Sequence, residues 1–339
     1  MMAKRTNNAA SLDCHLLVRL WPERAADAFP ALQTLLSRAE HRAQAAESIE
    51  AWLCRSFGVA RQHDWPIAPL TLAVDGAEPG SYYWLRADPV HLSVRGVELV
   101  LAPPGSLDLT RAEADALTAA LNQHFSDDGL RFQALTPLRW YLRLDRPPEL
   151  RTCMPSQVAG RRIESFLPEG ADRARWRRLF NEAQMVLHQH AVNQEREDRD
   201  RITANSLWFW GGGSKPTRIN QPFAHVWSDC ALARGLGLAS GARLHSLPPH
   251  ATHWLDCAES GSHLLVWESR ASSPDTASRL EAEWFAPLLR ELKAGRPRRL
   301  ILTLPSPSGV HQFELTRGSL WRIWRPRKPL STYFSSPQC

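Results

Sequence analysis

The sequence has little lysine, no paired cysteine motif and no long apolar run. Four of its 41 basic residues are lysine, and the rest are arginines spread along all 339 residues. Against 35 acidic residues the formal net charge is +6, which by itself predicts no particular partner. No apolar run approaches the ~18 residues that a membrane-spanning helix requires. We therefore expect no membrane partner.

The six cysteines are scattered and form no Cys-x-x-Cys pair. The first eleven residues carry two positive charges with no apolar stretch behind them, which is not the pattern of a signal peptide. We therefore expect reduced thiols in a cytoplasmic protein. An apolar content of 43% and a charged content of 22% are typical of a globular chain. The 14 tryptophans indicate a core or a recess.

Hydrophobic periodicity divides the N-terminal half into short elements. We predict a strand at 13–21, a helix at 25–57 and a loop at 58–80. Residues 91–102 read as a hairpin with a two-residue turn, and Thr110 with Glu113 forms a capping box before a helix over 113–123. Strands at 130–136 and 138–144 complete a compact α+β lobe.

The C-terminal half begins with the clearest helical stripe, over 171–197. Residues 205–213, Asn-Ser-Leu-Trp-Phe-Trp-Gly-Gly-Gly, are the densest aromatic segment and read as a buried strand. A strand from 262, a helix over 275–293 and a strand over 299–304 predict parallel strands with a crossover helix. Residues 311–325 read as a final hairpin.

Three local patterns could carry chemistry. Gly-Gly-Gly-Ser-Lys-Pro-Thr (211–217) lacks the spacing of a phosphate loop, so a tight turn is the favoured interpretation. His188 with His190, and His250 with His253, are poorly placed as metal ligands. Trp-Arg-Ile-Trp-Arg-Pro-Arg-Lys (321–328) fits either a nucleic-acid platform or, as we favour, a sheet-edge strand.

The order of several segments resembles the archaeal-type, cofactor-independent phosphoglycerate mutases of the alkaline phosphatase superfamily. Residues 83–92 look like the family's strand entering its inserted lobe, and residues 223–248 look like a later family segment. The most specific match is 186–213, in which eight positions fall in register: Val192, Asn193, Glu195, Arg196, Ala204, Asn205, Gly211 and Gly213. The aromatic segment also fits an uncharacterised bacterial group of phosphoglycerate-mutase-like proteins.

The resemblance implies an α/β fold: an alkaline-phosphatase-like core sheet flanked by helices, with an inserted smaller α+β lobe. We expect the discontinuous core at 12–75 and 200–325, the lobe at 78–170, a connecting helix at 171–199 and a tail at 326–339.

The family's chemistry requires two divalent metals and a nucleophilic serine, and this sequence departs from the pattern that supplies them. Leu20 and Trp21 stand where the first strand should end in Asp-Gly, and neither Ser48 nor Ser56 falls clearly at the nucleophile. The later Asp-x-x-x-His pair is replaced by Ala271 and Asp275. At the final Asp-His stand Pro305 and Ser306, and Trp210 replaces the arginine before Gly-x-Gly.

We therefore expect a non-catalytic relative that binds an unknown small molecule or protein, with no cofactor, no metal and no catalytic residues. The candidate ligand-binding residues are Asn193, Arg196, Asn205, Trp208, Trp210, Lys215 and Arg218. Phe209 and Trp227 could line the same recess, and caps, surface charges and core packing explain the whole set equally simply.

Two alternatives remain open. An active mutase or phosphatase could draw new metal ligands from a set of five residues: His225, Asp229, His253, Asp256 and Asp275. A nucleic-acid-associated protein would rest on the net charge and residues 321–328, but the dispersed arginines disfavour it.

Overall fold

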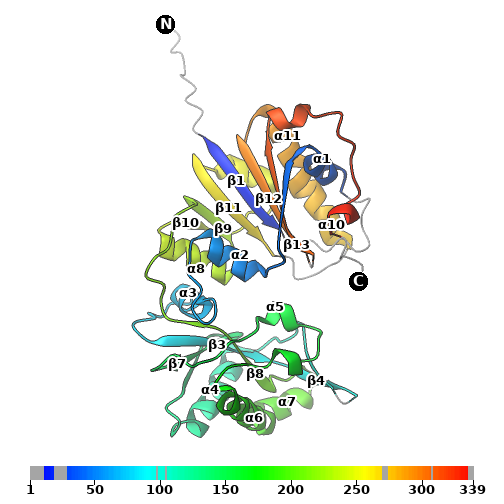
Figure 1. The fold of residues 1–339 in the computed structure, drawn as a ribbon. Helices are drawn as coiled ribbons and strands as arrows, with labels where there is room; N and C mark the ends of the chain where they lie inside the picture. Colours follow the sequence, from blue (N-terminus) through cyan, green and yellow to red (C-terminus); the bar gives the residue numbers. More distant parts are fainter. Residues whose placement is uncertain are drawn as a thin grey trace. The chain divides into compact units, whose positions relative to one another are not determined.

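The computed structural model describes residues 11–18, 29–96, 98–103, 105–268, 274–306 and 308–334. Residue contacts divide the chain into unit 1, residues 1–49 and 221–339, and unit 2, residues 50–220 (Figure 1). Unit 2 is thus an insertion between two parts of unit 1.

Unit 1 contains a seven-stranded mixed sheet in the order β10-β9-β11-β1-β12-β13-β2. The strands are β1 (Leu12–Val18), β2 (Glu40–Gln44), β9 (His225–Ser228), β10 (Arg243–His245), β11 (Gly261–Trp267), β12 (Arg299–Ser306) and β13 (Gly309–Thr316). The first five in the spatial order pair in parallel, and β13 and β2 add antiparallel strands. The predicted α/β class is confirmed, as are the parallel strands β11 and β12.

Helices flank both faces of this sheet (Figure 1). They are α1 (Pro30–Arg38), α8 (Ala231–Ser240), α9 (Ala251–Cys257), α10 (Pro274–Leu280), a π-helical turn η3 (Glu281–Phe285), α11 (Ala286–Ala294), a 3-10 turn η4 (Gly318–Trp321) and α12 (Ser331–Phe334). Alternate residues of β1 (Cys14, Leu16 and Val18) point into one core with α1 and α11. On the opposite face, Gly237 of α8 lies against Leu244 and Val226, where a side chain would clash.

Unit 2 contains a four-stranded antiparallel sheet in the order β6-β7-β3-β8 and a separate hairpin, β4-β5. Its strands are β3 (Tyr83–Val90), β4 (Leu92–Arg95), β5 (Glu98–Leu101), β6 (Arg131–Thr136), β7 (Arg139–Leu144) and β8 (Ser206–Gly213). Its helices are α2 (Ile49–Ser56, whose first residue falls in unit 1), α3 (Ile67–Val74), α4 (Arg111–His124), α5 (Pro155–Val158), η2 (Glu164–Phe166), α6 (Arg173–Gln189) and α7 (Ala191–Glu197). Helix α3 packs on one side of the sheet, and α4 and α6 lie on the other (Figure 1).

Several predicted elements are confirmed in unit 2. Strands β4 and β5 form the predicted hairpin, and β6 and β7 the predicted pair. Thr110 caps α4 by accepting from the Glu113 backbone, while the Glu113 carboxylate accepts from the Thr110 backbone.

Other predicted elements were wrong. The helix predicted over 25–57 is interrupted by β2. This segment is a strand because it pairs with β13, a contact that its own sequence does not reveal. The loop predicted at 58–80 contains α3, because Pro69 lies in the first turn, where proline is tolerated. The helix predicted over 171–199 breaks at His190, which is extended and caps α7 with its own ring nitrogen.

The final hairpin was also wrong. Strand β13 is already paired on both edges, by β12 and β2, so no edge remains for a strand after it. The chain forms η4 instead. Strand β8 pairs with β3 in unit 2. The predicted boundaries, which assign residues 200–325 to the core, stay a prediction.

Candidate functional site

The parallel strands of unit 1 define where a ligand would bind. Open α/β sheets bind ligands at the carboxyl ends of the strands, where neighbouring strands connect in opposite directions. Strands β9 and β11 are such neighbours, because β9 leads outward to β10 and β11 crosses over to β12. The candidate site therefore lies at the ends of β9, β11, β1 and β12, and the next residues along the chain decide its chemistry.

The described end of β9 is held by internal hydrogen bonds. The buried Ser228 hydroxyl accepts from the Cys230 backbone at 3.0 Å and donates to the Val266 carbonyl at 3.4 Å. Arg234 of α8 donates to the carbonyls of Ser228 and His245. These contacts fix the turn from β9 into α8.

The end of β12 turns directly into β13. Pro305 pairs with Val310 and Ser306 with Gly309, so the strand ends in a tight hairpin. The Ser306 hydroxyl lies 2.8 Å from the Ser308 hydroxyl and donates to the Gly309 carbonyl at 2.9 Å. The two positions that the resemblance equates with Asp-His therefore serve the turn.

The remaining strand ends are only partly described. Leu20, Trp21 and Ala271 lie outside the described residues, as does the side chain of Asp275. Asp229 follows β9 and accepts from the Leu247 backbone at 3.4 Å, and Glu268 follows β11. Within the described ranges, no three histidine, cysteine, aspartate or glutamate side chains form a group able to hold a metal ion. The described donors at this edge therefore do not fit a two-metal centre.

The predicted polar ligand-binding residues of the matched segment make structural contacts in unit 2. Asn193 is 1% exposed; its amide donates to the carbonyls of Leu187 and Ala204 and accepts from the Ala204 backbone. Asn205 bonds both backbone groups of Leu92.

Arg196 is 2% exposed and binds three partners. Its guanidinium donates to the Ile202 carbonyl at 2.8 Å, to Glu113 at 2.9 Å and to Asp108. Arg201 shares the Asp108 carboxylate, and hydrogen bonds from Arg201 and Arg196 lower the Asp108 pKa to about 2. Arg196 therefore joins the start of α4 to α7.

The two predicted tryptophans lie on the α3 face of the unit 2 sheet. Trp208 donates to the Cys153 carbonyl at 2.8 Å, and Trp210 donates to the Asp88 carboxylate at 2.8 Å. Asp88 forms a buried ion pair with Arg86 at 2.7 Å, and the guanidinium of Arg86 also lies 5.1 Å from the centre of the Trp210 ring. Trp210 is thus a structural partner of this pair.

Of the seven predicted ligand-binding residues, two have exposed side chains: Lys215 and Arg218. Both follow β8 in unit 2. The structure brings Trp208 and Trp210 together on one strand but leaves the polar candidates in separate contacts. Ligand binding by any of the seven stays a prediction.

Sequence reasoning missed a histidine cluster on β9, β10 and β11. His225 lies 3.1 Å from His245 between ring nitrogens, and its ring stacks on that of His263 with centroids 4.4 Å apart. Trp227 and Trp254 both donate to Nδ1 of His263, which leaves Nε2 to donate to the Glu259 carbonyl. The three histidines meet only through strand register, so no local spacing signals them.

Two of the alternative metal ligands, His253 and Asp256, form no metal-binding group with this cluster in the described residues. His253 and Asp256 belong to α9, where His253 contacts His250 edge to face and lies 3.8 Å from the sulfur of Cys257. Burial lowers the pKa of His225 and of His245, and it lowers that of His263 to about 4. All three imidazoles are therefore neutral near pH 7.

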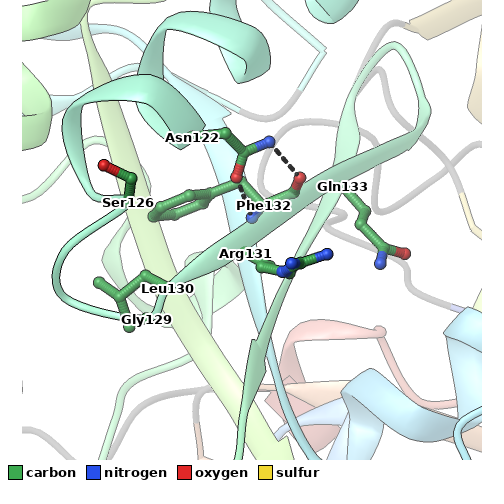
Figure 2. Close-up of a pocket in the computed structure, with 7 residues that line it drawn as sticks. All are labelled: Asn122, Ser126, Gly129, Leu130, Arg131, Phe132 and Gln133. Carbon is green, nitrogen blue, oxygen red and sulfur yellow. Dashed lines mark hydrogen bonds between the residues drawn. The ribbon is translucent and has the colours of Figure 1, made fainter.

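Unit 2 has a separate surface hollow of about 500 Å³ at the end of α4 and the start of β6. Figure 2 shows its lining residues, with the Asn122 amide bonded to both backbone groups of Phe132. Its only charged lining side chain is Arg131. The Asn122 amide here holds the connection between α4 and β6.

Comparisons with known proteins agree with this fold. No protein-family profile matches the chain. The 2,3-bisphosphoglycerate-independent phosphoglycerate mutase of Methanosarcina mazei is 26% identical over 210 residues, 55% of this chain and 52% of that protein. The enzyme of Methanosarcina barkeri is 24% identical over 280 residues, 69% of this chain and 70% of that protein. A probable mutase of Geobacter sulfurreducens is 28% identical over 182 residues, 51% of this chain and 45% of that protein.

Two solved structures have the same fold. A cofactor-independent phosphoglycerate mutase from Thermoplasma acidophilum aligns with a TM-score of 0.50 at 16% identity, over 96% of this chain and 95% of that chain. A protein from Pyrococcus horikoshii aligns with a TM-score of 0.55 at 12% identity, over 91% of this chain and 87% of that chain. The chain spans about half the length of the first curated relatives it matches. It is therefore similar, at low identity, to archaeal-type cofactor-independent phosphoglycerate mutases.

Proposed function

We propose that this protein is a phosphoglycerate-mutase-like protein that has lost two-metal phosphoryl transfer and acts by binding a small molecule or a protein. The observation that carries the proposal is the end of β12. There Pro305 and Ser306 close a tight hairpin with β13, at the positions where the resemblance expects a metal-ligating Asp-His pair.

The position of Trp210 supports the same proposal. An arginine at this place could contact a phosphoryl group, whereas the indole of Trp210 donates to Asp88 beside Arg86. A buried, fully bonded ion pair is poorly suited to exchange partners with a substrate, because removing one member leaves an uncompensated charge.

We further propose membership of the bacterial subgroup marked by the aromatic segment 205–213, and a cytoplasmic location. The cysteines support the location. Cys14 and Cys54 are buried and free, and burial raises the pKa of Cys14 and, to about 12, that of Cys54, so both are inert thiols.

Metal binding tests this proposal. The chain is dialysed against micromolar Mn²⁺, Co²⁺ or Zn²⁺, and bound metal is measured by elemental analysis, with the Methanosarcina mazei mutase as the positive control. We expect less than 0.1 metal per chain, as an order-of-magnitude limit, because the described strand-end donors do not group.

A stoichiometry near two per chain would overturn the proposal. A matched pair of variants would then locate the site: Asp229→Asn at the end of β9 would reduce binding, and Asp256→Asn on α9 would not. Undiminished binding in both variants would indicate that metal binds to other residues.

A further inference from the structure

The segment that begins at the last residue of η4 exposes apolar side chains to an unusual degree. Trp321, Ile323 and Trp324 are 74%, 71% and 75% exposed. Side chains of this size are normally buried, and adjacent exposed ones mark an interaction surface. We call residues 321–328 the Trp–Arg loop.

Basic side chains hold this loop against the protein. Arg322 donates to the Arg38 carbonyl at 3.3 Å and to the Glu40 carboxylate at 3.0 Å, and Arg325 donates to the Ala39 carbonyl at 2.9 Å. Arg38 in turn donates to the carbonyl of the buried Leu320. The loop therefore turns two guanidiniums inward and three apolar side chains outward. A surface already fixed in this way loses less conformational entropy on binding.

The charge around the apolar side chains has one sign. Residues 317–328 include four arginines and one lysine and no aspartate or glutamate. Arg327 and Lys328 are exposed beside the tryptophans. An anionic partner surface is therefore complementary.

We propose that the Trp–Arg loop binds the surface of a membrane rich in anionic lipid, inserting Trp321, Ile323 and Trp324 among the headgroups. Tryptophan is favoured at membrane interfaces, and nearby cations add attraction to anionic lipid. Ile323 separates this surface from a nucleic-acid platform, because a branched aliphatic side chain neither stacks on a base nor bonds a phosphate. The guanidiniums of Arg322 and Arg325 also already donate to backbone carbonyls at the end of α1.

Vesicle sedimentation tests this inference on the full chain. Vesicles of equal parts phosphatidylglycerol and phosphatidylcholine are compared with vesicles of phosphatidylcholine alone, at 0.1 and 0.5 M NaCl. We expect binding to the anionic vesicles that weakens with salt, and a loss of about tenfold or more in the variant Trp321→Ser/Ile323→Ser/Trp324→Ser.

Two control variants separate the loop from general effects. Met185→Ser removes an apolar side chain that is 62% exposed on α6, and Arg175→Gln/Arg177→Gln removes two exposed charges from the same helix. Arg327→Gln/Lys328→Gln, which removes the same charge from the loop, should weaken binding to anionic vesicles more than the α6 pair does.

Three results would overturn the inference: no sedimentation of the wild-type chain with anionic vesicles, equal binding by the triple-serine variant, or equal loss in both charge variants. Binding of a single-stranded oligonucleotide that the triple-serine variant loses, without vesicle binding, would assign the loop to nucleic acid instead.

Discussion

The two units differ in the charge state of the polar groups they bury. Unit 1 buries neutral imidazoles: desolvation lowers the pKa of the buried His225, His263 and His311. Unit 2 holds ion pairs, of which Arg86–Asp88, Arg139–Asp75 and Arg196–Glu113 are the most buried. Neutral imidazoles and ion pairs both avoid an isolated buried charge, but acid disrupts the two arrangements at different pH values.

The ion pairs of unit 2 also tie strands to one another. Asp88 accepts from Arg86, from the Trp210 indole and from the Trp140 backbone, and so joins β3 to β7 and β8. Burial alone would raise the pKa of Asp75, but hydrogen bonds from Arg139 and Tyr141 outweigh it and lower that pKa. The Asp75 carboxylate therefore stays charged near neutral pH and keeps its contact with Arg139.

Breaking the Arg86–Asp88 pair should have the largest effect. The substitution Asp88→Asn leaves the Arg86 guanidinium buried without its counter-charge, and we expect the free energy of unfolding to fall by about 3 kcal/mol. Urea unfolding followed by circular dichroism measures the change. The exposed pair Arg111–Asp115 supplies the control, because Asp115→Asn should cost less than about 0.5 kcal/mol. Similar losses in both variants would contradict the assigned role of the buried pair.

Acid should destabilise unit 1 before unit 2. The pKa of His263 falls from 6.5 to about 4 on folding, so between these values the unfolded chain binds a proton that the folded chain does not. Stability is therefore complete above pH 6.5 and decreases as the pH falls toward 4, by about 3 kcal/mol for this residue. Hydrogen exchange of 261–267 should accelerate across this window. The lowered pKa of Asp75 preserves its bonds to Arg139 and Tyr141 through the same window, so exchange of 139–144 should not accelerate there. Acceleration of both segments together would show that the two units do not respond independently.

The smallest effect concerns Asn193. Replacing it with alanine removes three hydrogen bonds between its amide and backbone groups, and we expect a loss of about 2 kcal/mol in unfolding free energy. Gln194→Ala, on an exposed neighbour, is the matched control. If Asn193→Ala leaves stability unchanged, its role is not structural, and the predicted ligand-binding role gains weight.

Local signals in the sequence determined the elements that could be predicted. The Thr110–Glu113 capping box gave α4, and the turn between residues 92 and 101 gave the β4–β5 hairpin, because both signals lie within a few residues. Strand β2 and the segment after β13 could not be predicted, because their conformation depends on which strand edges of the sheet are already occupied.

The same reasoning applies to the candidate site. The sequence predicted correctly that Trp208 and Trp210 belong to one buried strand. It could not show that the Trp210 indole contacts Asp88 and Arg86, because that contact depends on the register of β3 and β8. Nor could it reveal the histidine cluster, whose three members lie on three different strands.

Turnover tests the central claim, that the strand-end chemistry of the phosphoglycerate mutases has been replaced by structural contacts. The full chain is incubated with 3-phosphoglycerate and Mn²⁺, and the interconversion with 2-phosphoglycerate is followed by phosphorus NMR beside the Methanosarcina mazei enzyme. We predict no 2-phosphoglycerate above the protein-free control. Product formation that depends on added metal would contradict it, and would place working ligands at the carboxyl edge of unit 1.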